Sequence, residues 1–326
     1  MEDPATVTRE ELKRAATGPG QTVLRAPSGP GVLRRILSGL GLAALFGGFM
    51  ALDYFLRGGL GITVDGGVQV VDSLLKGGIV LAVLGAVLVG AALYEYCRIV
   101  EKLGVVLWRP LLVAAGVLVF LGQWVGWIYY YMPFNIIPAW LREPGQTAVV
   151  VLCAVTFVVL AGRVLTGRVE GSLQAAGLTG LGIVYVSVML GFVGAIRSAW
   201  DVAGVVTFVA VCKITDTGGY FAGTLIGGPK IAPRVSPKKT VAGAIGGTLA
   251  AMLVALFISS FDGSILTPRQ ALLYGLLMGP VAILGDLSES VLKRQADLKD
   301  LPVLDLLDSV IFAAPFSYLF FSFIKR

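Results

Sequence analysis

Two pairs of carboxylates toward the C-terminal end of the chain have the spacing of neighbours on one helical face. Asp286 and Glu289 form the first pair, and Asp305 and Asp308 form the second. Residues three apart point the same way from a helix. The chain contains no histidine, and carboxylate oxygens are the ligands that Mg²⁺ prefers in proteins. The spacing therefore predicts a magnesium site, although Asp305 also suits the start of a helix, where a carboxylate stabilises the macrodipole.

Basic side chains that can bind phosphate accompany these carboxylates. Lys293 follows Glu289 by four residues and shares its predicted helical face. Residues 229–240 contain further basic and hydroxyl side chains, namely Lys230, Arg234, Ser236, Lys238, Lys239 and Thr240. All of these donate hydrogen bonds to phosphate oxygens. A positive loop beside anionic lipid has the same composition, so charge alone leaves both interpretations open.

Two more acidic residues lie within apolar segments, where ionisable groups usually face the bundle interior or a water-filled site. Asp216 follows Lys213 by three residues, which indicates either a polar cavity or a buried ion pair that fixes helix packing. Glu95 lies between Tyr94 and Tyr96 near the end of an apolar segment. It is either functional or simply placed at the membrane interface.

The missing residue types exclude several chemistries. Without histidine, the chain has no imidazole base, no Ser–His or Cys–His nucleophile pair and no imidazole metal ligand. The cysteines Cys97, Cys153 and Cys212 are too far apart for a zinc motif, and we expect reduced thiols. What remains is a metal-and-phosphate site, which suits phosphoryl or nucleotidyl transfer.

The elements that position these residues are predicted to be membrane-spanning helices. The 326 residues are 56% hydrophobic and only 14% charged, with a mean hydropathy of +0.85, whereas soluble proteins carry about 25% charged residues. A transmembrane helix needs about 20 mostly apolar residues. The sequence therefore predicts an all-α, polytopic transmembrane bundle of about nine spans, at residues 37–56, 78–97, 111–131, 147–162, 174–195, 203–224, 241–260, 271–291 and 309–324.

The distribution of basic residues predicts the orientation, with the N-terminus inside and the C-terminus outside. Of the 26 lysines and arginines, 18 lie in the tail and predicted inner loops, 7 lie on the outer side, and Lys213 lies within a span. The carboxylates and the loop 229–240 then face the cytoplasm. We expect a flexible cytoplasmic tail at 1–35, N-terminal helices at 36–200 and a catalytic region at 201–326.

Several segments resemble the CDP-diacylglycerol synthase (phosphatidate cytidylyltransferase) family. The most specific is Ser-Val-Leu-Lys-Arg-Gln-Ala-Asp-Leu-Lys-Asp at 290–300, which matches the family signature Ser-x-hydrophobic-Lys-Arg-x₄-Lys-Asp. The other matching segments are Gly-Asp-Leu-Ser-Glu at 285–289, Ser-Pro-Lys-Lys-Thr at 236–240, Gly-Ala-Ile-Gly-Gly at 243–247, the stretch 216–223 and Ala-Leu-Tyr-Glu-Tyr at 92–96. The resemblance covers about residues 210–315.

This resemblance implies that CTP and phosphatidate react to give CDP-diacylglycerol and pyrophosphate, in phospholipid biosynthesis. It implies Mg²⁺, with a second monovalent or divalent cation, and a multi-pass enzyme of the cell membrane whose active site faces the cytoplasm. The expected partners are CTP, phosphatidate, the lipid bilayer and a second copy in a homodimer, with no nucleic acid. The lipid phosphate would attack the α-phosphorus of CTP directly, so no histidine base is required.

The family's site residues transfer to matching positions in this sequence. The resemblance implies catalytic roles for Asp286, Lys293 and Asp308, and metal binding by Asp286, Asp305 and Asp308. It implies substrate binding by a larger polar set, made up of Asp216, Ser236, Lys238, Lys239, Thr240, Glu289, Arg294 and Lys299.

The sequence departs from the family after Asp300. Members usually continue through a Pro-Gly-His-Gly-Gly turn into Asp-Arg-x-Asp, whereas here Leu-Pro-Val-Leu-Asp-Leu-Leu-Asp follows directly at 301–308. Both aspartates remain, but Leu306 replaces the arginine. The alternatives are a CTP-dependent lipid-alcohol kinase, a catalytically impaired membrane relative and an ion-coupled transporter. Inverted repeats would favour the transporter, and the charged motifs are confined to the C-terminal half.

Overall fold

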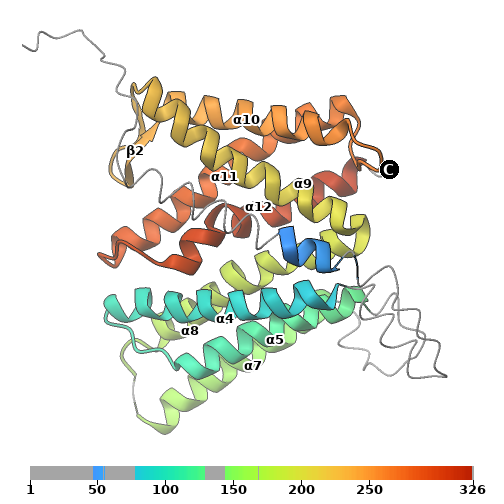
Figure 1. Ribbon diagram of the computed structural model, residues 1–326. Helices are drawn as coiled ribbons and strands as arrows, with labels where there is room; N and C mark the ends of the chain where they lie inside the picture. Colours follow the sequence, from blue (N-terminus) through green and yellow to red (C-terminus); the bar gives the residue numbers. More distant parts are fainter. Residues whose placement is uncertain (1–46, 54, 56–77, 129–143, 168, 325–326) are drawn as a thin grey trace, which may run out of the picture.

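The protein is a bundle of long α-helices, as the hydropathy predicts. The computed structural model describes residues 47–53, 55, 78–128, 144–167 and 169–324, and nearly all of them are helical (Figure 1). The predicted tail at 1–35 and most of the predicted span at 37–56 lie outside the described residues, although 47–53 form a short helix. The fold class is therefore all-α, and the helices have the length and apolar composition of a polytopic membrane protein.

The first half of the molecule consists of helices that pack side by side in the lower part of Figure 1. They are α4 (Ile79–Lys102), α5 (Arg109–Ile128), α7 (Pro144–Leu165) and α8 (Ser172–Gly182). The chain then continues without a break through a π-helical segment, η2 (Ile183–Val188), into α9 (Met189–Leu225). Helix α5 contacts α4, α7, η2 and α9, and so lies at the centre of this half.

The second half holds a small hairpin and three helices. Strands β1 (Lys230–Ala232) and β2 (Ser236–Thr240) pair antiparallel, with Lys230 opposite Thr240. Helices α10 (Val241–Ser259), α11 (Pro268–Gln295) and α12 (Pro302–Ile324) follow. Helix α10 packs on α9 and α11, and α12 packs on α11 and α9. The hairpin and the α11–α12 connection both lie at the left-hand end of the molecule (Figure 1).

Seven helical runs in the described residues are long and apolar enough to cross a membrane. Six of them match predicted spans, but the predicted spans at 174–195 and 203–224 are joined in one run, Ser172–Leu225, of 54 residues. A helix of that length measures about 80 Å, whereas the hydrocarbon core of a bilayer is about 30 Å thick. The run bends sharply at Asp201, so its two arms each have the length of one crossing. The direction of crossing stays a prediction.

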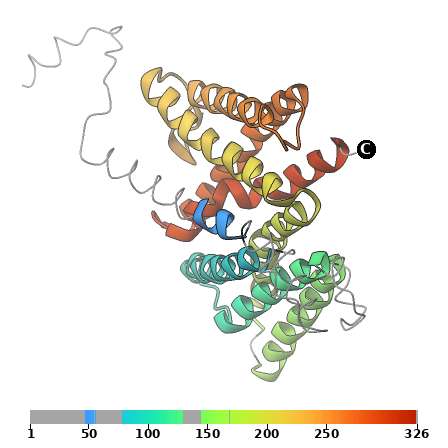
Figure 2. The ribbon, with the colours of Figure 1, turned by 45° about the vertical axis from the view of Figure 1, so that its right-hand side comes forward.

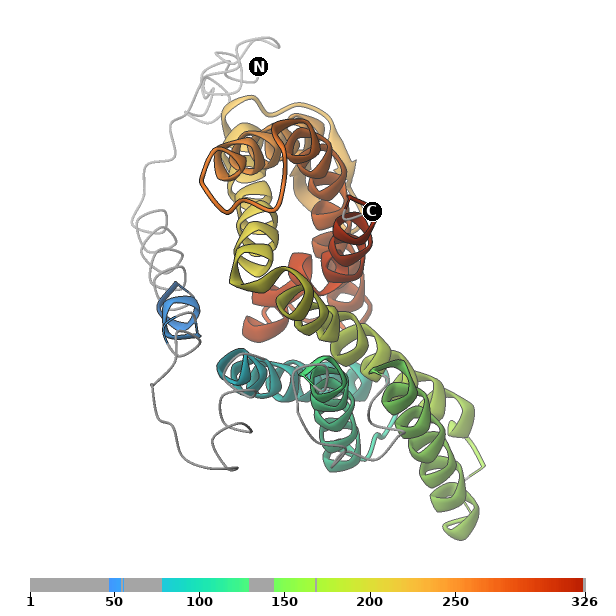
Figure 3. The ribbon, with the colours of Figure 1, turned by 90° about the vertical axis from the view of Figure 1, so that its right-hand side faces the viewer.

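The bend is visible at the right-hand end of Figure 1 and from the side in Figure 3. Asp201 has φ 61° and ψ −163°, a backbone conformation that non-glycine residues rarely adopt. The guanidinium of Arg197 lies 2.9 Å from Asp201 and 2.7 Å from Asp53 of the short helix 47–53. Arg197 and Asp53 are both buried. This ionic cluster therefore joins the bend to the beginning of the described chain.

Glycines allow the helices of the second half to approach closely. A Cβ atom on Gly247 would lie 2.6 Å from the carbonyl oxygen of Thr215, and one on Gly243 would lie 2.8 Å from that of Gly219. Helices α9 and α10 are therefore in backbone contact, as small residues four apart predict. Figure 2 shows α9 and α10 running close to each other in this half. The bend at Asp201 within α9 is next to the expected boundary between residues 200 and 201, and the division into these regions stays a prediction.

Candidate active site

Three carboxylates converge where α11 and α12 pack against each other. Asp286 and Glu289 project from α11 and Asp308 projects from α12, and one oxygen of each lies within 4.8 Å of the others. The approach depends on Gly285, where a Cβ atom would lie 2.8 Å from the carbonyl oxygen of Asp308. Asp308 also accepts a 2.5 Å hydrogen bond from the backbone N–H of Ser309. The helices themselves therefore hold the carboxylates in place.

A compact turn sets the register between these two helices. The N–H of Leu298 donates to the carbonyl of Lys293 at 2.9 Å, and the N–H of Asp297 donates to that of Arg294 at 3.3 Å. Asp297 has a positive φ of 51°. This pattern is the Schellman motif that commonly ends a helix. It occupies the part of the chain next to the missing Gly-His-Gly-Gly turn, and α12 begins at Pro302 after a short connection.

The beginning of α12 is fixed by a carboxylate from a distant helix. Glu95 of α4 accepts hydrogen bonds from the backbone N–H groups of Val303 at 3.1 Å and Leu304 at 2.9 Å. These donors belong to the first turn of α12, where a helix has no internal partners for them. Glu95 is 8% exposed. Its carboxylate therefore caps the helix that carries Asp305 and Asp308, and does not reach out to the membrane interface.

Two lysines neutralise part of the carboxylate cluster. Lys239 at the end of β2 lies 2.5 Å from Asp286. Lys293 lies 2.8 Å from Glu289 and 2.7 Å from Asp305. Asp305 thus faces Lys293 and lies close to Glu289, but it is not one of the three converging carboxylates. Glu289, which was expected to bind substrate, is one of the three. The metal-binding role of Asp305 stays a prediction.

A second polar group from α9 lies beside the cluster. Lys213 is 3.6 Å from Asp216 and donates to the carbonyl of Leu306 at 2.7 Å. The hydroxyl of Ser309 donates to Asp216 at 3.0 Å. The Lys213–Asp216 pair predicted from spacing is therefore present, and it connects α9 to the backbone of α12. Ser309 was not singled out in the sequence, because no spacing rule links it to a residue 93 positions away.

The other predicted substrate residues form no ion pair to these carboxylates within the described residues. Thr240 is buried and caps α10 through a hydrogen bond from the N–H of Gly243 at 3.1 Å. Arg294 donates to the carbonyl of Val235 at 3.2 Å, which ties α11 to the hairpin. Lys238 and Lys299 are exposed, and Ser236 is half-buried. Within the described ranges, the ion pairs to these carboxylates come from Lys213, Lys239 and Lys293.

The residues present fit a divalent cation. Glu289 is 1% exposed, and neither of its carboxylate oxygens has a hydrogen bond of good geometry within the described residues, although one is close to Lys293. Burial of a charged carboxylate without hydrogen bonds costs folding free energy unless another group, such as a cation, compensates its charge. Three carboxylates with free coordination capacity supply the oxygen ligands that Mg²⁺ prefers. Asp286, Glu289 and Asp308 are therefore suited to hold it.

The observation that decides the family is the match to a model of the cytidylyltransferase family, which extends over residues 62–324. The chain belongs to the cytidylyltransferase family. The match includes both halves of the bundle and every residue of the carboxylate and lysine groups. Membership of this family makes a nucleotide the expected reactant of the site and agrees with the phosphate-binding chemistry of its lysines.

A short segment of the chain is similar to a protein with a more specific name. The chain is 48% identical over 56 residues to a protein named phosphatidate cytidylyltransferase from Synechocystis sp. (strain ATCC 27184 / PCC 6803 / Kazusa). The matched segment covers 15% of this chain and 19% of the relative. The chain therefore matches about a fifth of that protein's length, so the likeness is strong locally and does not extend to the whole relative.

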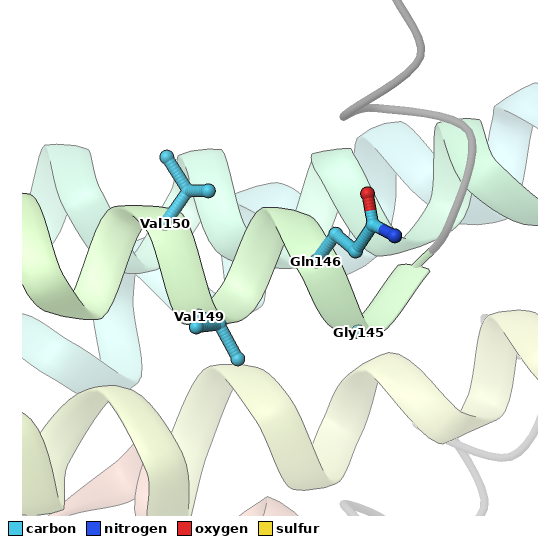
Figure 4. Close-up of a pocket in the computed structure, with 4 residues that line it drawn as sticks. All are labelled: Gly145, Gln146, Val149 and Val150. Carbon is cyan, nitrogen blue, oxygen red and sulfur yellow. The ribbon is translucent and has the colours of Figure 1, made fainter.

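A surface hollow at the start of α7 is separate from the carboxylates. It is lined by Gly145, Gln146, Val149 and Val150, and Figure 4 shows Gln146 and Val150 pointing away from Val149 on this helix. Helix α7 begins at the right-hand end of the molecule, opposite the hairpin (Figure 1). The hollow contains no ionisable lining residue, so it does not contribute to the cation-and-phosphate chemistry.

Proposed function

We propose that the chain is a phosphatidate cytidylyltransferase, which joins CTP and phosphatidate to give CDP-diacylglycerol and pyrophosphate. The observation that carries the proposal is the convergence of Asp286, Glu289 and Asp308 beside Lys239 and Lys293. Family membership over residues 62–324 and the partial match to the Synechocystis protein support the same assignment. This combination suits the transfer of a nucleotidyl group between two phosphate-bearing substrates.

The side chains divide into a cation-binding group and a phosphate-binding group. Asp286, Glu289 and Asp308 would hold Mg²⁺, which offsets negative charge on phosphate oxygens in such transfers. Lys239 and Lys293 are placed to exchange a carboxylate partner for a phosphate oxygen, because each lies at the edge of the cluster. Lys238, Arg294 and Lys299 would extend this positive surface toward the solvent.

In the proposed reaction, a phosphate oxygen of phosphatidate forms a bond to the α-phosphorus of CTP. The bond from that phosphorus to the bridging oxygen breaks, and pyrophosphate leaves with the electron pair. The attacking oxygen is already ionised, so the absence of histidine from the chain is no obstacle. The lysines then stabilise the charge that develops on the leaving pyrophosphate.

We further propose that the protein lies in the cell membrane with this site at the cytoplasmic face. The excess of basic residues on the predicted inner side, 18 against 7, supports this orientation. The hairpin and the α11–α12 connection lie at one end of the bundle (Figure 1). A site at that end is reached by CTP from water and by phosphatidate from the bilayer.

The test is an assay of purified full-length protein in detergent with Mg²⁺, CTP and phosphatidate. We expect CDP-diacylglycerol to form, and we expect Asp286→Asn to reduce the rate by at least about 100-fold, since even groups behind a metal ligand cost about 10- to 100-fold. The matched control is Asp262→Asn, which changes an exposed aspartate in the loop before α11 and should leave the rate unchanged.

Two outcomes would contradict this proposal. Full activity of Asp286→Asn would remove Asp286 from the cation-binding group. Failure to form CDP-diacylglycerol, with phosphorylation of a polyprenol by CTP in its place, would identify the protein as a lipid-alcohol kinase.

A further inference from the structure

A buried tyrosine from the first half of the molecule has a hydroxyl group without a partner. Tyr185 is 8% exposed, and its hydroxyl makes no hydrogen bond to any part of the chain that the structure describes. Two other buried tyrosines are satisfied. Tyr96 donates to the carbonyl of Leu178 at 2.9 Å, and Tyr274 bonds the hydroxyl of Ser317 at 2.6 Å. A buried hydroxyl without a partner costs free energy, so Tyr185 calls for an explanation.

Tyr185 lies within electrostatic range of the carboxylate cluster. It belongs to the π-helical segment η2, which packs against α12, and it interacts electrostatically with Glu289, Asp308 and Asp286. Short π-helical segments inside α-helices occur frequently at functional sites. The segment therefore brings a polar side chain from η2 to a site whose charged residues come from the hairpin, α11, α12 and the C-terminal arm of α9.

The cationic donors around the cluster are already engaged. Lys239 pairs with Asp286, Lys293 pairs with Glu289, and Lys213 donates to the backbone of α12. Tyr185 is different because its hydroxyl is a neutral donor that makes no hydrogen bond to the described residues, so none of these bonds must break when a ligand binds. A ligand that enters with hydrogen-bond acceptors would satisfy this hydroxyl directly. Phosphate oxygens are such acceptors, and the proposed substrates both carry them.

We propose that Tyr185 is a ligand-binding residue of this site and that its hydroxyl donates a hydrogen bond to a phosphate oxygen of the bound ligand. The inference rests on the proposed function in one respect, namely that the site binds phosphate groups. It does not depend on which lipid accepts the nucleotidyl group. It extends the site from α11, α12, the hairpin and the C-terminal arm of α9 to η2, and so gives the helices before the bend a direct part in binding.

The test compares Tyr185→Phe with Tyr96→Phe, which removes the same atom from a satisfied buried tyrosine. Pyrophosphate with Mg²⁺ is the probe, and its affinity for the purified full-length protein is measured by titration calorimetry. The loss of a hydrogen bond to a charged group should raise the dissociation constant for pyrophosphate about 10-fold or more in Tyr185→Phe. Its unfolding temperature should not fall, because the hydroxyl makes no hydrogen bond within the described part of the unliganded protein. Tyr96→Phe should unfold at a lower temperature and keep its affinity.

The outcomes separate this inference from the proposed function. Unchanged pyrophosphate affinity in Tyr185→Phe, or no pyrophosphate binding by the unmodified protein, overturns the role of Tyr185. So does an equal loss of affinity in Tyr96→Phe, because that result indicates a structural effect. If Tyr185→Phe alone weakens pyrophosphate binding while no CDP-diacylglycerol is formed by the unmodified protein, the role of Tyr185 stands and the proposed reaction is wrong.

Discussion

Gly285 is the residue on which the geometry of the carboxylate cluster depends most directly. It precedes Asp286 on α11 and faces Asp308 and Phe312 of α12. Any side chain there meets the backbone of α12, which cannot move as a flexible side chain can. The glycine is therefore required for close approach, and its helical backbone needs no special conformation.

We expect Gly285→Ala to separate α11 from α12 and to impair both folding and activity. The added Cβ would lie 2.8 Å from the Asp308 carbonyl oxygen and 2.8 Å from Cβ of Phe312. Overpacking of this kind costs about 1–3 kcal/mol. Thermal unfolding and CDP-diacylglycerol formation measure the two effects. Gly177→Ala in α8, where a Cβ would meet nothing within 4 Å, is the control. Equal stability and activity in both variants would contradict the argument.

At the scale of the elements, α12 is positioned by a residue that lies 208 positions from its first turn. Glu95 accepts the N–H groups of Val303 and Leu304, and a carboxylate at this end also favours the helix dipole. Because Asp305 lies in the same first turn and Asp308 on the next one, the cap also sets the direction in which they point. Helix α4 thus takes part in the geometry of the site without contributing a side chain to its chemistry.

We expect Glu95→Ala to lower stability by about 0.5–2 kcal/mol, as the loss of a helix cap does. It should also raise the Mg²⁺ concentration required for half-maximal CDP-diacylglycerol formation, because Asp308 is held less firmly. Thermal unfolding and a magnesium titration of the rate test this. Glu101→Ala provides a control on the same helix, since Glu101 pairs with Arg109 at the surface. A magnesium requirement that shifts equally in the two variants would count against positioning by Glu95.

The elements of the fold could largely be predicted from the sequence, whereas their irregularities could not. Apolar length located the helices, because burial in a bilayer demands about 20 apolar residues. The same criterion separated the spans 174–195 and 203–224 on either side of Asp201. It is blind to backbone angles, so it did not predict that the helix continues through this gap with a sharp bend. Likewise, the cap by Glu95 depends on a contact between distant segments, and local spacing left its role open.

In the site, too, contacts between residues close in the sequence could be predicted, whereas contacts between distant segments could not. The spacing of Asp286 and Glu289 and of Lys213 and Asp216 placed each pair on one helical face, as the structure confirms. The contact of Lys239 with Asp286 joins a strand to a helix, and no sequence period encodes it. Tyr185 gave no signal, because a tyrosine in an apolar run is ordinary.

At the scale of the whole molecule, the ionic cluster at Arg197 joins the bend to the start of the described chain. Arg197 bridges Asp201 and Asp53, and it also fills the space beside Gly78, where a Cβ would lie 3.1 Å from its side chain. The bend lies at the end of the bundle opposite the hairpin (Figure 1). We therefore expect the cluster to stabilise the packing of the bundle and to have no direct part in the proposed reaction.

We expect Arg197→Gln to destabilise the protein by about 3–5 kcal/mol, because it removes the cation that pairs with the buried carboxylate of Asp53 and the half-buried one of Asp201. Adding Asp53→Asn should recover part of the loss, so that the double variant is more stable than the sum of the single effects predicts. Chemical denaturation in detergent measures these energies. The rate per folded molecule should stay unchanged. Additive losses would show that Asp53 and Arg197 are not energetically coupled.

The pairing of lysines and carboxylates has a consequence for electroneutrality. Among the described residues, the inner part of the site, without the outer cations Lys238, Arg294 and Lys299, contains five carboxylates and three ammonium groups. These are Asp216, Asp286, Glu289, Asp305 and Asp308 with Lys213, Lys239 and Lys293. The formal charge of the set is therefore two negative, which one divalent cation cancels. A bare nucleotide anion is repelled by such a set and a cation is attracted. We therefore expect the nucleotide to bind as its magnesium complex. The negative formal charge of the set would favour the cation over a bare nucleotide.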